Sequence, residues 1–129
     1  MMPNNDFENA IDITVNSTFI TEHIIDGSLQ YVFNYTISIL NNSATAVKLL
    51  SRYWLITDAE GETSTVDGEG VIGQQPNIAA NSHFTYTSGC ILKTPIGYMQ
   101  GHYQMIDINN KKRLVDIPLF QLAKPNSLH

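Results

Sequence analysis

The sequence predicts an all-β fold, a β-sandwich of immunoglobulin or fibronectin III type with about seven or more short antiparallel strands. In several segments apolar side chains alternate with polar ones, which is typical of a strand with one buried and one solvated face. Turn-forming residues recur at intervals of about eight to twelve residues. No segment has the apolar repeat of an amphipathic helix. We expect a single domain over residues 11–122, between a flexible leader (1–10) and a flexible tail (123–129).

The first part of this domain predicts a β-hairpin. Apolar residues occupy alternate positions of 11–19 and then change parity, which indicates a strand with a bulge near Phe19. Asp26-Gly27 follows as a hairpin-turn sequence. Residues 30–39 then give the most regular alternation in the chain, and the polar run 41–43 should end that strand.

The next strand should lie at the centre of the fold. Residues 47–57 carry apolar side chains on both parities, so we expect both faces of this strand to be covered, at least in part. Trp54 is assigned to the core. A turn at 58–61 and a short exposed strand at 62–66 should lead into a glycine-rich segment.

The rest of the chain predicts, after a loop, three further strands at 83–87, 98–108 and 113–120. Ser88-Gly89 should break the first of them, and residues 90–97, which contain Pro95, should form a long connection. Asn109-Asn110 marks a hairpin. Pro118 places the last strand at an edge, or near a strand end, because proline donates no hydrogen bond to a ladder.

Gly68, Gly70 and Gly73 have the G-x-G-x-x-G spacing of a dinucleotide-binding loop. That loop requires a following helix to receive the pyrophosphate, whereas here Pro76 interrupts the chain and no helical repeat follows. We therefore interpret residues 68–73 as a glycine corner within a β-protein. Its glycines serve backbone geometry, or else its amides form a nest for an anion.

Arg52 lies on the central strand, which otherwise carries mostly apolar residues. A guanidinium there needs a carboxylate or an anionic ligand, and we expect a structural pair with an acidic residue. The alternative is a pyrophosphate-binding or nucleotide-binding site, in which Arg52 and the amides of 68–73 hold the phosphates.

Neither metal binding nor catalysis has a specific motif. His23, His83 and His102 lie on separate segments without metal-ligand spacing, so we expect no metal site and no cofactor. Acidic residues cluster at Asp58, Glu60, Glu62, Asp67 and Glu69. They would give at most a weak oxygen-based site for Mg²⁺ or Co²⁺, and turns collect acids without one. Ser88 and Cys90 could act as nucleophiles with a histidine base, but a turn and a small buried thiol explain them more simply, so we expect no enzyme.

Composition narrows the partners and the compartment. The formal charge of −5 disfavours a nucleic-acid partner. Cys90 is the chain's one cysteine and fits a reducing, cytoplasmic compartment. There is no uninterrupted apolar run of about twenty residues, so we expect no membrane insertion. The sequence leaves the oligomeric state open, a homodimer included.

Five blocks, in order along the chain, make it resemble the ApaG family, also called CorD: 51–58 (SRYWLITD), 68–76 (GEGVIGQQP), 86–90 (YTSGC), 94–105 (TPIGYMQGHYQM) and 117–120 (IPLF). The resemblance extends from about Val15 to Leu122, and it implies a fibronectin III-like or immunoglobulin-like sandwich. It also implies an association with cobalt and magnesium resistance or efflux. One departure is Tyr53, where the family usually has histidine.

Together these observations predict a non-catalytic binding or interaction module. We expect a protein partner or a small anionic ligand, bound at the glycine corner or at residues 97–103. The candidate ligand-binding residues are Gly68, Gly70, Gly73, Arg52 and His102. Any effect on ion efflux would be indirect.

Overall fold

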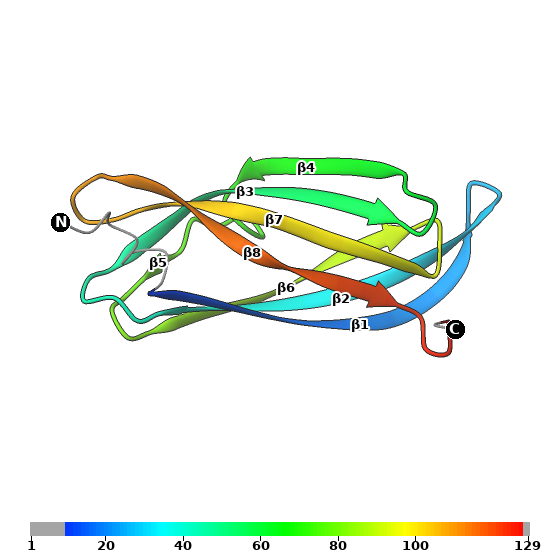
Figure 1. Ribbon diagram of the computed structural model, residues 1–129, viewed down its shortest axis with the longest axis horizontal. Helices are drawn as coiled ribbons and strands as arrows, with labels where there is room; N and C mark the ends of the chain where they lie inside the picture. The colour runs from blue at the N-terminus through cyan, green and yellow to red at the C-terminus, as the bar shows by residue number, and fades with distance from the viewer. Residues whose placement is uncertain (1–9, 128–129) are drawn as a thin grey trace.

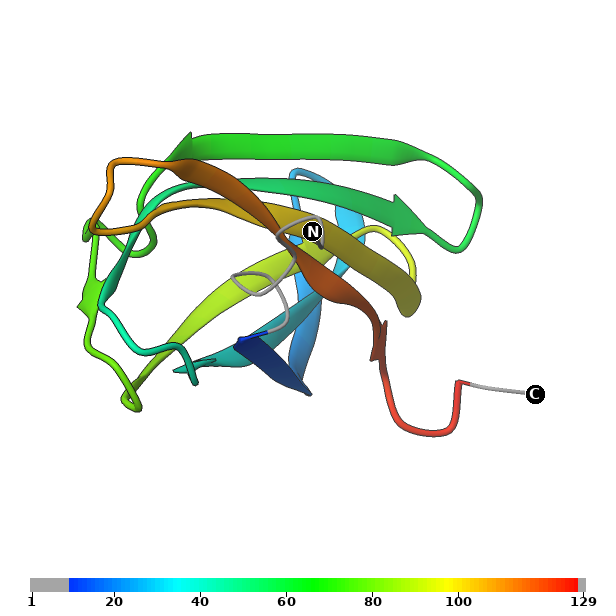
Figure 2. The same ribbon diagram turned by 60° about the vertical axis from the view of Figure 1, so that its left-hand side comes forward.

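The computed structural model describes residues 10–127, and within them the chain forms the predicted all-β sandwich. Two antiparallel sheets pack face to face (Figures 1 and 2). The three-stranded sheet has the order β1 (Ile11–Ile25), β2 (Ser28–Asn41) and β6 (His83–Leu92). The five-stranded sheet has the order β4 (Thr63–Glu69), β3 (Val47–Asp58), β7 (Ile96–Ile106) and β8 (Lys112–Ala123), with the short β5 (Asn77–Ile78) beside one end of β3.

The two sides of the sandwich differ. On one side β1 and β8 approach each other, and the Ser17 hydroxyl donates to the Gln121 carbonyl at 2.9 Å. Lys124 forms an ion pair with Glu22 on the same side. On the other side lie β4 and β6, each of which pairs with only one strand within the described residues. The sandwich is therefore joined along one side and has two free strand edges along the other.

Bulges explain the irregular patterns in the sequence. The register of β1 with β2 shifts between Phe19 and Thr21, as the change of parity predicted. A second shift, between Leu49 and Ser51 on β3, turns Leu49 and Trp54 to the same buried side although they differ in parity. The apolar residues on both parities of β3 thus come partly from this bulge. Pro118 lies at a third shift, in the edge strand β8, as its missing donor required.

The core lies between the sheets. Trp54 is 2% exposed, which confirms its predicted place, and its indole makes edge-to-face contacts with Tyr35 and Phe120. The hydroxyls of Tyr86 on β6 and Tyr103 on β7 form a buried hydrogen bond from one sheet to the other. Burial raises the pKa of both phenols, so both stay neutral at physiological pH.

A buried asparagine anchors the end of β2. The Asn41 amide nitrogen donates to the carbonyls of Thr45, Ile78 and Ala79, and its oxygen accepts from Ser43. Asn41 is fully buried, so these bonds satisfy a side chain that would otherwise be costly to bury. The polar run that was predicted to end a strand therefore also holds the β2–β3 connection.

Several predicted boundaries were wrong. β6 continues through Ser88-Gly89 to Leu92, because its ladder with β2 is unbroken there and Gly89 needs no special backbone angle in it. The connection to β7 is consequently only residues 93–95. β4 extends to Glu69, so Gly68 belongs to a strand, and the two-residue β5 was not predicted.

The expected leader lies outside the described residues except for Ala10, as do the last two residues of the expected tail. β8 ends at Ala123, and the Lys124 amide donates to the Pro95 carbonyl at 2.8 Å. No helix long and apolar enough to cross a bilayer occurs in residues 10–127.

Candidate functional site

The glycine corner contains three differently placed glycines. Gly70 and Gly73 have positive φ angles of 64° and 77°, and Ile72 between them also has a positive φ. Gly68 does not have a positive φ, so its own backbone angles do not require glycine. At Gly70 a Cβ would lie 2.1 Å from the Gln74 carbonyl oxygen, which excludes any side chain.

Two amides of the corner, and that of the adjacent Gln74, already have protein acceptors. The Gly70 amide donates to the Leu50 carbonyl at 2.7 Å, and Val71 and Gln74 exchange backbone hydrogen bonds of 2.8 and 2.9 Å. Val71 is fully buried and fastens the corner to the core. An anion nest needs several amides that point outward, whereas these three amides donate to carbonyls of the protein itself.

Arg52 fastens the same corner from the neighbouring strand. Its Nη1 donates to the carbonyls of Glu69 at 3.2 Å and Gly70 at 2.9 Å. The expected pair with an acidic residue is thus replaced by two backbone acceptors. Gly68 pairs with Arg52 in the ladder, and a Cβ there would lie 3.1 Å from Nη1, so its missing side chain makes room for the guanidinium.

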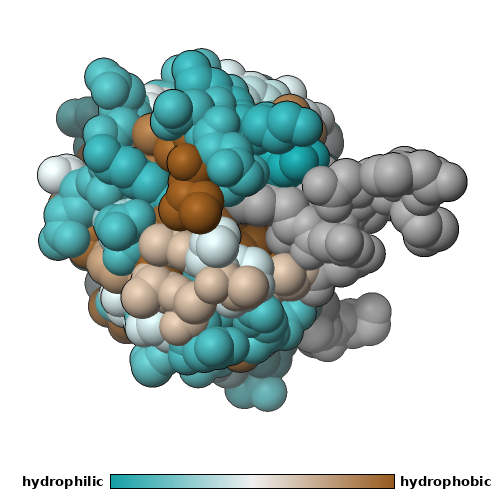
Figure 3. Space-filling view, turned by 90° about the vertical axis from the view of Figure 1, so that its left-hand side faces the viewer, coloured by the Kyte–Doolittle hydropathy of each residue, from teal (hydrophilic) through white to brown (hydrophobic). Residues whose placement is uncertain are grey.

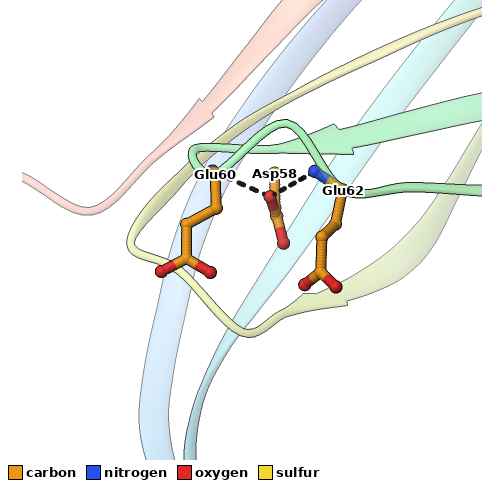
Figure 4. A group of neighbouring side chains, drawn as sticks. All are labelled: Asp58, Glu60 and Glu62. Carbon is orange, nitrogen blue, oxygen red and sulfur yellow. Dashed lines mark hydrogen bonds between the residues drawn. The ribbon is translucent and has the colours of Figure 1, made fainter.

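The acidic residues at the β3–β4 turn are explained by the turn itself (Figure 4). Oxygens of Asp58, Glu60 and Glu62 lie within 4.8 Å of one another. However, Asp58 Oδ1 accepts the amides of Glu60 at 2.8 Å and Glu62 at 3.0 Å, which is the bonding of an Asx turn. Asp67 and Glu69 lie further along β4, outside this group.

The remaining reactive side chains are dispersed. His23 and His83 are exposed on β1 and β6, and His102 is partly buried on β7. Burial raises the pKa of the Cys90 thiol to about 11, so very little thiolate exists at neutral pH. This makes Cys90 a weak nucleophile, in agreement with its interpretation as a small buried residue.

One row of side chains crosses the outer face of the five-stranded sheet. Cross-strand pairing places Asp67 (β4), Tyr53 (β3), His102 (β7) and Asp116 (β8) side by side in that order. The rings of Tyr53 and His102 stack, with centroids 5.1 Å apart and planes 21° apart. We call these four residues the outer-face row. It has two adjacent rings at its centre and a carboxylate at each end.

A shallow hollow lies on each side of the two stacked rings. Tyr53 and His102 line both hollows, and the exposed side chains of Leu119 and Leu114 border one hollow each. Gly101 allows the close approach of β3 and β7 beneath the rings, because a Cβ there would lie 1.9 Å from the Tyr53 carbonyl oxygen. The face thus offers aromatic, apolar and acidic groups within a small area.

Of these residues, the sequence singled out His102 as a candidate and missed Asp116 and both leucines. A signal for Asp116 was present. The β7–β8 hairpin turns about Asn109, so residues equally distant from it pair, as His102 and Asp116 do. At the end of the sandwich that carries the β7–β8 turn, apolar residues gather in a central patch between hydrophilic areas above and below (Figure 3).

Comparison with known proteins agrees with this architecture. Residues 22–107 match the ApaG domain. Protein ApaG of Proteus mirabilis is 48% identical over 119 residues, which cover 92% of this chain and 95% of the relative. An X-ray structure of a structural genomics target superposes with a TM-score of 0.92 at 41% identity, covering 95% of this chain and 93% of that one. A Bordetella pertussis protein described as ApaA gives 0.82 at 39% identity, covering 91% and 95%.

Proposed function

The chain belongs to the ApaG family, and from that premise we propose that it is a cytoplasmic, non-catalytic interaction module that binds a protein partner. The outer-face row of the five-stranded sheet is the proposed contact surface. The observation that carries the proposal is the Tyr53–His102 stack, which lies between two hollows and is flanked by Asp67 and Asp116.

The chemistry of the row suggests what the partner presents. Aromatic side chains at the centre of a contact area are the commonest source of binding energy between proteins. The carboxylates of Asp67 and Asp116 favour a partner with arginine or lysine side chains, and an arginine can also stack on the Tyr53 ring. The chain's net charge of −5 adds long-range attraction for a basic partner.

An association with cobalt and magnesium resistance would then act through the partner. The acidic turn is bonded within itself, and the described histidines do not converge. We expect calorimetry to detect no sub-micromolar Co²⁺ site on the untagged chain. A tight stoichiometric site that histidine-to-alanine changes abolish would contradict this and support direct metal handling.

A pyrophosphate or nucleotide ligand at residues 68–73 is the second candidate function. The observation in its favour is the pair of consecutive positive-φ residues, Ile72 and Gly73, because such turns can aim successive amides at an anion. Against it stand the committed amides of Gly70, Val71 and Gln74 and the net negative charge. Titration with ATP and with pyrophosphate tests it, since binding tighter than about 100 μM would favour this function.

The test of the protein interface uses two matched pairs of cross-strand neighbours. Tyr53→Ala/His102→Ala removes the stack, whereas Thr36→Ala/Thr87→Ala removes a hydroxyl pair, 2.7 Å apart, from the outer face of the other sheet. Each full-length variant is used to capture proteins from native lysate. A captured protein is then purified and titrated directly against both variants and the unmodified chain.

We expect the purified partner to bind the unmodified chain and the threonine variant equally, and the Tyr53/His102 variant at least about ten-fold more weakly. Equal binding by all three would place the interface elsewhere and overturn the proposal.

A further inference from the structure

The free side of the sandwich contains a cavity that neither the glycine corner nor the outer-face row uses. It lies between the two sheets where β4 and β6 border the gap, and its volume is about 340 Å³. Both sheets contribute to its walls: Arg52, Trp54 and Val66 from one, and Tyr35, Ser88 and Cys90 from the other. This volume is at the lower end of the range for small-molecule sites, about 300–1,000 Å³. We call it the edge crevice.

Trp54 lines the edge crevice and carries a buried hydrogen-bond donor without a partner in the described part of the chain. The side chain is 2% exposed, and its Nε1 has no hydrogen-bond partner within the described residues. Buried donors are almost always paired in folded proteins, because leaving one unpaired is destabilising. Less than 1 Å² of this nitrogen is exposed, so an acceptor in the crevice reaches it only if the indole shifts on binding.

Arg52 gives the same cavity a positive charge. Only its Nη1 donates to the glycine corner within the described residues, which leaves the other guanidinium nitrogens without a protein acceptor. No acidic side chain is among the residues that line the crevice. The site therefore favours an anion and disfavours a cation.

The walls limit what kind of anion fits. Besides Trp54 and Tyr35, the aliphatic side chains of Ile56, Val66 and Met99 line the space. A polyphosphate would leave most of its oxygens against apolar groups and only one guanidinium to neutralise them. A molecule with a single anionic head and an apolar body matches both halves of the cavity.

We propose that the edge crevice binds a small monocarboxylate with an aromatic or branched aliphatic body. The carboxylate lies against the Arg52 guanidinium, and the body packs against Trp54 and the other apolar walls. Ser88 lines the same space, but its hydroxyl is already hydrogen-bonded to Tyr35. Arg52 also borders one hollow of the outer face, but Tyr53 and His102, which carry the proposed protein interface, do not line the crevice.

Trp54 also provides the measurement, because it is the chain's one tryptophan and lines the cavity. Phenylacetate is titrated into the full-length protein while the tryptophan fluorescence is followed. Phenethylamine, of similar shape but opposite charge, is the matched control ligand, and inorganic pyrophosphate tests the excluded class. We expect a saturable change with phenylacetate at a Kd below about 1 mM, and none with the other two.

Two neighbouring residues on β4 test the location. Val66 pairs with Trp54 and is 41% exposed at the rim of the crevice, so Val66→Phe should block the opening while the protein stays folded. Thr65 pairs with Leu55 on the outer face, so Thr65→Phe adds the same ring on the other side of the strand. We expect Val66→Phe to weaken phenylacetate binding at least about ten-fold and Thr65→Phe to leave it unchanged.

Several results would overturn the proposal: no saturable fluorescence change, equal binding of phenethylamine, or unchanged binding by Val66→Phe. Tyr53→Ala/His102→Ala serves as an independent control, because it disrupts the proposed protein interface and leaves the crevice lining intact. If this variant still binds phenylacetate, ligand binding in the crevice is independent of the proposed protein interface. Failure of one proposal then does not imply failure of the other.

Discussion

The glycine corner and the outer-face row lie beside each other on β3 and β4, yet they use their polar groups in opposite ways. In the corner, the Gly70 amide and the Arg52 guanidinium donate to backbone carbonyls of the same unit. In the row, no hydrogen bond or ion pair within the described residues joins the side chains of Tyr53 and His102 to other groups, and only their stacking restrains them. The polar groups of the corner are hydrogen-bonded within the protein. The polar atoms of the two stacked rings have no such partner within the described residues and are free to bind another molecule.

This difference shows that the recognisable motif and the available surface need not coincide. The G-x-G-x-x-G spacing serves the geometry of a turn, in which Gly70 fits against Gln74 and Gly68 makes room for Arg52. The row has no motif, because its members come from four strands and meet only through pairing. Changes in the corner should therefore reduce stability, and changes in the row should reduce binding.

The largest expected effect comes from the residue beneath both regions. Trp54→Ala should lower the free energy of unfolding by about 3–5 kcal/mol, because it removes a buried indole that contacts Tyr35 and Phe120. Such a loss is a large part of the usual 5–15 kcal/mol. Urea denaturation followed by circular dichroism measures it. A loss below about 1 kcal/mol would mean that the Trp54 side chain is exposed rather than packed in the core.

The second prediction separates two glycines of the corner. Gly70→Val should cost about 2–4 kcal/mol, because the positive φ disfavours a side chain and the Cβ would clash with the Gln74 carbonyl. Gly73 also has a positive φ, but a Cβ at this position has no atom within 4 Å. Gly73→Ala should therefore lower the free energy of unfolding by only about 1 kcal/mol. Thermal unfolding of both variants gives the comparison. Equal losses would show that the close contact at Gly70 is not decisive.

The third prediction concerns the clamp on the corner. Arg52→Met keeps much of the side-chain stem and removes both hydrogen bonds to the carbonyls of Glu69 and Gly70, so stability should fall by about 1–2 kcal/mol. Lys48→Met is the matched control, an exposed cation on the same strand, and should change stability by less than about 0.5 kcal/mol. If the two variants were equally stable, the Arg52 bonds would contribute nothing measurable to the corner.

Sequence reasoning succeeded where structure is determined locally. The alternation in residues 30–39 identified β2, and the change of parity near Phe19 identified a bulge. Pro118 predicted an edge strand or a strand end, and β8 is an edge strand. It failed at Ser88-Gly89, where a local breaker signal was overruled by ladder bonds to β2. A strand edge that already has a partner along its whole length tolerates a glycine that an isolated segment would not.

The candidate site was predictable in part for the same reason. Arg52 stood out because a charge within an apolar strand needs a partner, but its actual partners, two backbone carbonyls, depend on the path of the corner. The Tyr53–His102 contact requires the pairing of β3 with β7, which joins distant parts of the chain across a shifted register. No local pattern encodes that register, so the outer-face row emerges only from the folded sheet.

Asp116→Asn has the smallest expected effect on stability, and it tests whether the outer-face row, unlike the glycine corner, serves binding. Asp116→Asn at the end of the row should change the free energy of unfolding by less than about 0.5 kcal/mol, since the carboxylate is exposed and no hydrogen bond or ion pair within the described residues depends on it. If the row binds a basic partner, the same change should slow association and make it less sensitive to salt, because a rim charge acts mainly through long-range attraction. Association rates measured at two ionic strengths, with Asp12→Asn on β1 as an exposed control on the other sheet, give the result. If the two variants associated at equal rates, the charge of Asp116 would have no role in recognition. Only the stacked rings of the row would then contribute to binding.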